Sequence, residues 1–221
     1  MSDRQERLGT YTIKDFAAAA AFPALSFVDP LPRIPAMAAT TLQLEFLLQE
    51  SLVDLKAISK VILSDAGATL QIFRLVGEEF TNDQDRPTRI EDCIASLNSE
   101  CWYEAICQQG VSQNGRLVAE WQRCRRVGEC ARKLAFCLEG ISPDEAYIVG
   151  LLHRIGEFPD LLGWSTLGGS SREHYALGVM LADFWQLPDY LSCAIQEQQT
   201  SSMPVMWREL LHMAKQLADP V

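Results

Sequence analysis

Apolar residues recur every three or four positions along most of the 221-residue chain, which is the spacing of helices with one buried face. The clearest stripe lies in residues 115–138 and consists of Leu117, Trp121, Cys124, Val127, Ala131, Leu134 and Leu138. No stretch shows a convincing strand-like alternation of apolar and polar residues. The pattern therefore predicts an all-α fold.

The same period predicts further helices over 37–49, 51–63, 65–77, 89–97, 100–109, 142–154, 171–185, 188–198 and 204–218, and a short one over 14–21. The helix predicted over 51–63 places Leu52, Leu55, Ile58 and Ile62 on one apolar stripe, which is expected to be buried. Asp65 and Ser142 are expected N-caps, with Pro143 at the first helical position and Glu145 completing a capping box. Gly77 is the expected helix end. Residues 157–170 read as a glycine-containing connection.

Proline and glycine positions suggest how the chain is divided. Residues 1–30 form a variable N-terminal arm, and the prolines between Asp29 and Pro35 favour an extended segment. The turn at 110–115 is the best internal boundary. It separates an N-terminal helical lobe of residues 31–112 from a C-terminal helical lobe of residues 113–221, the two forming one unit.

Composition narrows the classes of function. The net charge of −10 disfavours nucleic acid and anionic membranes as partners. No run reaches the roughly 20 apolar residues of a membrane span, and the charged start at 1–7 does not resemble a secretory signal, so we expect a cytoplasmic protein. The seven cysteines include no CxxC pair and are interpreted as packing residues.

Three passages carry a family resemblance. They are Leu31-Pro-Arg-Ile-Pro35 followed by two helices and Ser64-Asp65, then Gly150-Leu-Leu-His-Arg-Ile-Gly156, then His174-Tyr-Ala-Leu-Gly178 leading to Phe184-Trp-Gln-Leu-Pro188. In this order and spacing they resemble the HDOD family, an output domain of bacterial signalling proteins related to the HD phosphohydrolases. The resemblance implies a multi-helix orthogonal bundle of HD-like type. Gly77-Glu78 and Asn98 depart from the family pattern, which indicates a divergent member.

HD phosphohydrolases bind divalent metals through histidines and aspartates, and the metal activates water. The matching positions form a vestigial HD pocket here: Arg123, His153, Arg154, His174, Gln198, Gln199 and Lys215. Arginine only donates hydrogen bonds and stays protonated. A dication about 4 Å from one such cation would be repelled by about 8 kcal/mol at an effective dielectric near 20. The resemblance therefore implies a degenerate site with no catalytic residues, no metal and no other cofactor.

We accordingly predict a non-catalytic regulatory domain that acts through contacts with a separate signalling protein. Two alternatives stay open. One is an HD-type phosphohydrolase with rearranged ligands, and the other is a sensor whose former metal pocket binds a nucleotide or another anion through Arg123, Arg154 and Lys215. The simplest interpretation is that Arg123 and Arg154 point to solvent or pair with acids such as Glu157, Glu173 or Asp183. His153 and His174 are then buried structural residues.

Overall fold

A computed structural model describes residues 34–50, 54–80, 85–107, 115–163, 171–198 and 206–219, apart from the side chains of 171–173 and 197. Every regular element in these ranges is a helix, which confirms the all-α prediction. In chain order they are α2 (Ala38–Gln49), α3 (Leu55–Leu63), α4 (Ala66–Glu79), α5 (Ile90–Ser96), α6 (Ser99–Cys107), α7 (Gly115–Ala135), α8 (Pro143–Leu152), the 3-10 helix η1 (Ile155–Glu157), α9 (Phe158–Leu161), α10 (Ser171–Phe184), α11 (Asp189–Glu197) and α12 (Met206–Ala218). The short helix expected over 14–21 lies outside the described residues.

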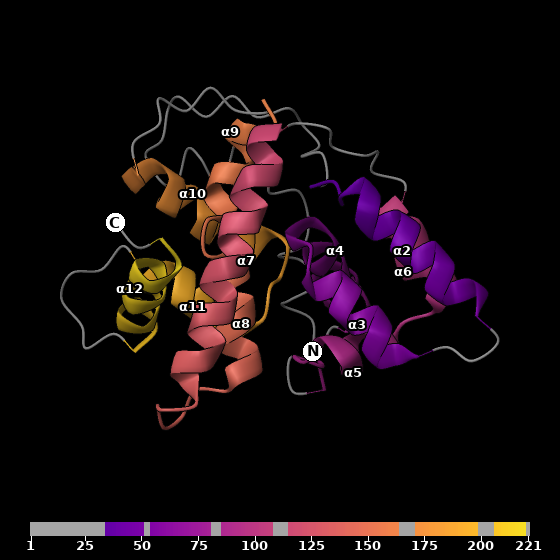
Figure 1. Ribbon diagram of the computed structural model, residues 1–221, viewed down its shortest axis with the longest axis horizontal. Coiled ribbons are helices and arrows are strands. Elements are labelled where there is room, and N and C mark those ends of the chain that lie inside the picture. The colour runs from indigo at the N-terminus through magenta and orange to yellow at the C-terminus, as the bar shows by residue number, and fades with distance from the viewer. Residues whose placement is uncertain are drawn as a thin grey trace, which may run out of the picture.

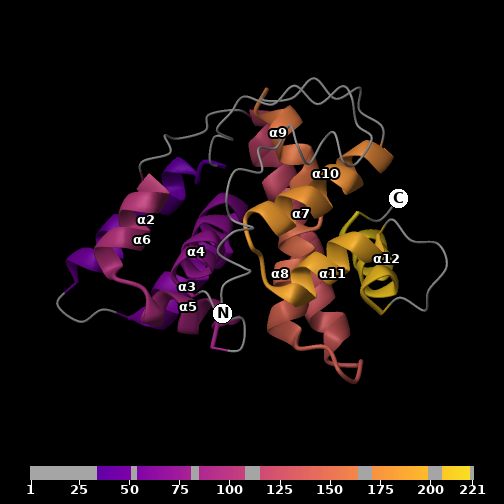
Figure 2. The same cartoon turned by 180° about the vertical axis from the view of Figure 1, so that it is seen from behind.

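The helices form two groups. Helices α2 to α6 gather on one side of the molecule and α7 to α12 on the other (Figures 1 and 2). A single cluster of buried apolar side chains nevertheless runs through both groups, including Phe73 and Trp102 in the first and Trp121 and Leu151 in the second. The two groups therefore share one core. None of the helices in the described ranges has the length and apolar character needed to cross a membrane.

Asp65 organises the N-terminal group. Its carboxylate accepts hydrogen bonds from the backbone N–H groups of Gly67 (2.8 Å) and Ala68 (3.1 Å), so it caps α4 as expected. The same carboxylate accepts a bond from the N–H of Met37 at 2.6 Å. One buried acid thus fixes the start of α4 to the residue that precedes α2.

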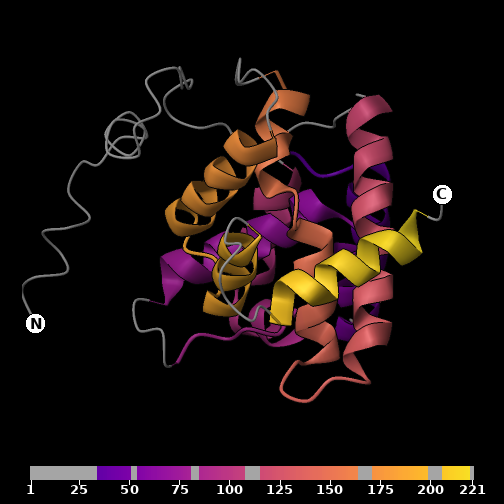
Figure 3. The same cartoon turned by 90° about the vertical axis from the view of Figure 1, so that its left-hand side faces the viewer.

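The C-terminal group is built on a close contact between α7 and α8. Gly128 and Gly150 face each other, and a Cβ atom added to Gly150 would lie 2.5 Å from the Cα of Gly128. Only glycine at this point lets the two backbones approach so closely. Helix α12 crosses α7 (Figure 3) and buries Trp207 and Leu210.

Side-chain hydrogen bonds of Tyr147 and Arg86 connect the groups. The Tyr147 hydroxyl on α8 donates to the carbonyl of Leu63 at 2.8 Å. The Arg86 guanidinium donates to the carbonyl of Phe73 on α4 at 3.4 Å and also to the carbonyl of Gln186, which follows α10. Gln186 has a φ of +50°, a conformation that is uncommon outside glycine.

Several predicted boundaries were wrong. Helix α4 continues past Gly77 to Glu79, because Gly77 is packed beneath Arg86 and does not form a C-terminal turn. Helices α7 and α8 end at Ala135 and Leu152, a few residues earlier than predicted. Residues 157–161, expected in a connection, belong to η1 and α9.

Two details of the predicted elements also differ. Leu55 was expected on a buried stripe, but it is 42% exposed because α3 begins there, while Ile58 and Ile62 are buried as predicted. The Ser142 side chain makes no capping bond. The other half of the capping box is present, since the Glu145 side chain bonds the Ser142 backbone.

Candidate functional site

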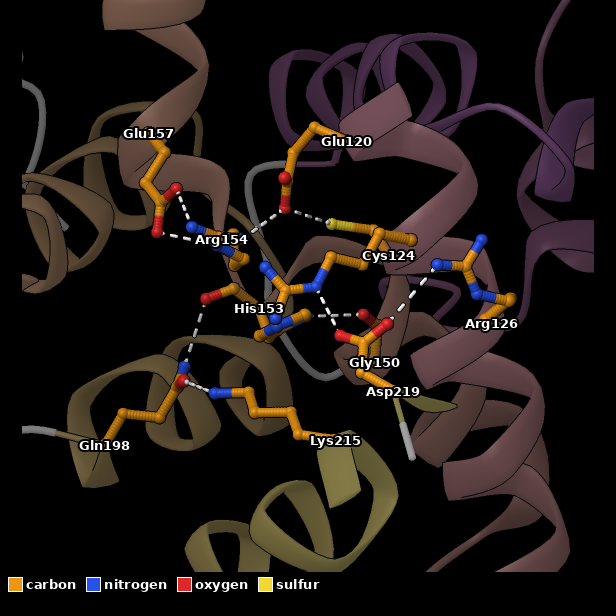
Figure 4. Close-up of polar contacts among 11 residues, drawn as sticks. Glu120, Cys124, Arg126, Gly150, His153, Arg154, Glu157, Gln198, Lys215 and Asp219 are labelled. Atoms are coloured by element: carbon orange, nitrogen blue, oxygen red, sulfur yellow. Dashed lines mark hydrogen bonds and ion pairs between the residues drawn. The ribbon is translucent and has the colours of Figure 1, made fainter. Parts of the chain in front are cut away.

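The candidate site lies where α8 ends. Seven consecutive residues of α8, from Ala146 to Leu152, are buried, so this helix runs through the interior. His153 is its C-cap, and Arg154 follows directly. The contact between α7 and α8 brings both residues near Glu120 and Cys124 of α7 (Figure 4).

His153 is a neutral, buried imidazole. His153 is 3% exposed, and its Nδ1 atom lies 2.7 Å from the carbonyl oxygen of Gly150. Because a carbonyl only accepts, Nδ1 carries the proton. Burial lowers the pKa of His153 well below its ordinary value, and the nearby Lys215 ammonium lowers it further. The ring is therefore neutral at pH 7, and Nε2 keeps its lone pair.

Arg154 forms two ion pairs. Its Nε donates to Glu157 at 2.6 Å, its Nη2 donates to the second oxygen of the same carboxylate, and its Nη1 donates to Glu120 at 2.5 Å. The three side chains are 16–23% exposed. Figure 4 shows the guanidinium between the two acids. Glu157 was an expected partner, and the pairing with it is confirmed.

Arg123 bonds the C-terminal end of the described chain. Its Nε lies 2.5 Å from an oxygen of Asp219, and Arg126 lies 3.3 Å from the other oxygen. These side chains are about one third to one half exposed. The pairs join the end of α12 to the middle of α7. Figure 4 shows Asp219 and Arg126 beside the site.

Lys215 reaches the site through Gln198. Its Nζ donates to Oε1 of Gln198 at 3.0 Å, and Nε2 of Gln198 donates to the carbonyl of His153 at 3.2 Å (Figure 4). The ammonium also lies 6.0 Å from the centre of the Tyr175 ring. Burial and the charge of Arg154 lower the pKa of Lys215 to about 8. In the part of the chain that the structure describes, no carboxylate contacts this ammonium.

His174 lies on the other side of a small cavity. The cavity has a volume of about 10 Å³, which admits about one water molecule, and its lining includes His153, Arg154, Glu157 and His174. His174 Nε2 lies 2.6 Å from a carboxylate oxygen of Asp160 on α9. His174 is therefore paired with Asp160, whereas Arg154 is paired with Glu120 and Glu157.

The structure thus brings together five of the positions matched to the HD pocket and places His174 across the cavity. The five are Arg123, His153, Arg154, Gln198 and Lys215. Gln199 lies outside the described residues. Two partners were not predicted from the sequence, namely Glu120 and Asp219. Glu120 lies 34 residues from Arg154 and is brought to it by the packing of α7 on α8, whereas Asp219 is brought in by the crossing of α12.

A divalent metal does not fit these residues. His153 Nε2 could donate a lone pair, but Glu120 and Glu157 are bound to Arg154, and Lys215 adds a positive charge. Among the described residues, no group of three or more His, Cys, Asp or Glu side chains could hold a metal ion. The arginine side chains have taken up the carboxylates that a cation would need.

Residues 31–162, more than half of the chain, match the HDOD domain family. The chain belongs to this family, as the sequence motifs predicted. No curated protein matches the chain.

The fold is also similar to a solved structure of the MmoQ response regulator from Methylococcus capsulatus str. Bath. The TM-score is 0.67 at 18% identity, over 85% of this chain and 84% of that one. A second structure of the same regulator, at 2.4 Å resolution, gives a TM-score of 0.67 at 17% identity, over 84% of this chain and 86% of that one. At this identity the likeness shows the fold, which is all-helical and HD-like.

Proposed function

We propose that this HDOD protein is a non-catalytic regulatory domain of bacterial signal transduction, which works in the cytoplasm through contacts with a separate signalling protein. The observation that carries the proposal is the pairing of Arg154 with Glu120 and Glu157. In an HD phosphohydrolase the residue after this histidine is a metal-binding aspartate. Here it is Arg154, whose guanidinium forms ion pairs with two carboxylates of the site. The fold shared with a response regulator supports the signalling role.

Metal analysis and phosphodiesterase assays test the absence of catalysis. Purified protein, loaded with Mn²⁺ and desalted, is measured by elemental analysis and assayed with added Mn²⁺ on nitrophenyl phosphodiesters and cyclic dinucleotides. An HD phosphohydrolase with intact ligands serves as the positive control. We expect far less than one metal per chain and the same background rate for the wild type and His153→Ala. Stoichiometric metal and turnover, both lost in His153→Ala, would show that the protein is an enzyme.

Lys215 favours a second candidate, in which the pocket senses an anionic nucleotide. This ammonium is held only by the neutral Gln198 and the Tyr175 ring in the described part of the chain. The small cavity and the paired arginines weigh against this candidate, because a nucleotide would have to displace side chains. Calorimetric titration with cyclic dinucleotides and alarmones tests it. Binding that weakens in Lys215→Met would support it, and no heat at high micromolar ligand would remove it.

A further inference from the structure

Helix α2 has a second apolar face that no described residue covers. Thr40 and Leu44 point into the core and are buried. On the opposite side, Leu42 is 53% exposed and Phe46 is 63% exposed. Residues four apart lie on the same side of a helix, so these two side chains form one patch, which continues toward the exposed Ala38 and Ala39. We call these four residues the outer face of α2.

The outer face lies at the periphery of the molecule. Helix α2 is at the outer edge of the N-terminal group in both views, on the side away from α7 to α12 (Figures 1 and 2). The shared core therefore does not explain why this face is apolar. A solvent-facing helix surface normally carries charged and polar residues. We therefore expect another segment or molecule to cover this apolar patch.

The chain supplies a segment of suitable chemistry nine residues before α2. Residues 16–28 read Phe-Ala-Ala-Ala-Ala-Ala-Phe-Pro-Ala-Leu-Ser-Phe-Val and contain no charged side chain. Such a run gains free energy when its aromatic and aliphatic side chains leave water.

The point of attachment allows this segment to reach the outer face. Ile34 is 1% exposed, its carbonyl accepts a bond from Gln71, and the N–H of Met37 is bonded to Asp65. The chain is thus fixed to the core just before α2. The peptide from Val28 to Ile34 spans up to about 20 Å when extended, and Phe46 lies about 12 Å along the helix from Ala38. A segment that turns back at the prolines can therefore cover both Leu42 and Phe46.

We propose that residues 16–28 dock on the outer face of α2 within the same molecule. A short tether gives the segment an effective concentration of about millimolar at this face, above that of any second copy in dilute solution. A second copy is also a poorer match, because two large exposed side chains fall well short of the roughly 800 Å² per partner of a stable interface. The docked segment covers Leu42 and Phe46 on the side of α2 that faces away from the core.

Photo-crosslinking in the full chain tests the proposal. Benzoylphenylalanine replaces Phe46 in one sample and Phe136, which is 76% exposed after the end of α7, in the control. Trypsin cuts after Lys14 and Arg33, so the segment is released as the peptide 15–33. We expect the Phe46 sample, and not the Phe136 sample, to yield this peptide crosslinked within a species of monomer mass. Crosslinks that occur only at dimer mass, or none to peptide 15–33, would overturn the proposal.

Hydrogen exchange of the full chain provides a second readout. We expect amides of residues 16–28 to exchange about tenfold or more slowly than in an unstructured peptide. The substitution Phe46→Asp should abolish this protection while α7 and α8 keep theirs, because the side chain is exposed in the described part of the structure. Phe136→Asp should leave the protection of residues 16–28 unchanged. Equal exchange of this segment in the wild type and Phe46→Asp would contradict docking.

Discussion

The guanidinium of Arg154 holds two carboxylates in a site with little access to water. Glu120 and Glu157 have side chains that are 16% and 21% exposed. If the cation is removed, the two acids lose their partner in surroundings that solvate charge poorly, and they also repel each other. Arg154 is thus a residue on which the local structure depends.

We therefore expect Arg154→Met to lower the free energy of unfolding by about 2–3 kcal/mol. Urea unfolding at pH 7 measures the change. Arg125→Met is the matched control, because Arg125 pairs with Glu129 on the surface, where both side chains are about half exposed. Its loss should cost no more than about 0.5 kcal/mol. Equal effects of the two substitutions would mean that the acids of the site do not need their cation.

The charge of Lys215 should make stability depend on pH in an unusual direction. Its pKa in the folded protein is about 8, below the ordinary value of 10.5, so the unfolded chain binds this proton more tightly. Stability rises with pH wherever the unfolded state holds more protons, which for Lys215 is the range between those two values. The cost of burying the ammonium is fully present below pH 8 and is lost as the pH rises.

Lys215→Met should remove this dependence. Relative to the variant, the wild type should gain about 2 kcal/mol of stability between pH 7 and pH 10. Urea titrations of both proteins at several pH values give the difference in their free energies of unfolding. The contributions of the other titrating groups are the same in both proteins and cancel in this difference. Lys133→Met, at an exposed position of α7, controls for the loss of a lysine. A constant difference between wild type and Lys215→Met would show that the ammonium is well solvated in the folded protein.

At the scale of the elements, the contact between α7 and α8 sets the position of the site. In Gly150→Ala the new Cβ would meet the Cα of Gly128 at 2.5 Å and its N at 2.7 Å, and backbone atoms cannot move aside alone. We expect a loss of about 2–3 kcal/mol despite the better helix propensity of alanine. Thermal unfolding checks this. Gly115→Ala, where nothing lies within 4 Å of the new Cβ, should be neutral or slightly stabilising. A neutral Gly150→Ala would mean that the helices can separate at no cost.

The elements were predictable where a local signal marks them. Asp65 caps α4 because its carboxylate reaches N–H groups two and three residues ahead, an interaction that is visible in the sequence. Helix α9 was missed because four residues are too short to show a period. Gly77 was wrongly predicted to end the helix. The Arg86 guanidinium packs against it and leaves no room for a side chain, and this tertiary contact cannot be seen in the local sequence.

The same distinction applies to the site when the whole molecule is considered. The pocket positions came from the family resemblance, and the pairing of Arg154 with Glu157, three residues away, could be anticipated. Asp219 lies 96 residues from Arg123 in the chain, so only the crossing of α12 over α7 brings them together. Contacts of this kind depend on the assembled fold and leave no local pattern.

Arg86 contributes to the contact between the two helix groups, because its guanidinium bonds one carbonyl from each of them, Phe73 and Gln186. Arg86→Met should leave both carbonyls without this donor and cost about 2–3 kcal/mol, as expected for hydrogen bonds to a charged group. Hydrogen exchange should then speed up both at the end of α4 and around Gln186. Arg89→Met is the control, since Arg89 is 62% exposed and reaches Asp144 of the other group only at 3.8 Å. Faster exchange in α4 alone would show that the bond to Gln186 contributes nothing, and the groups would then be held together by their apolar core and Tyr147.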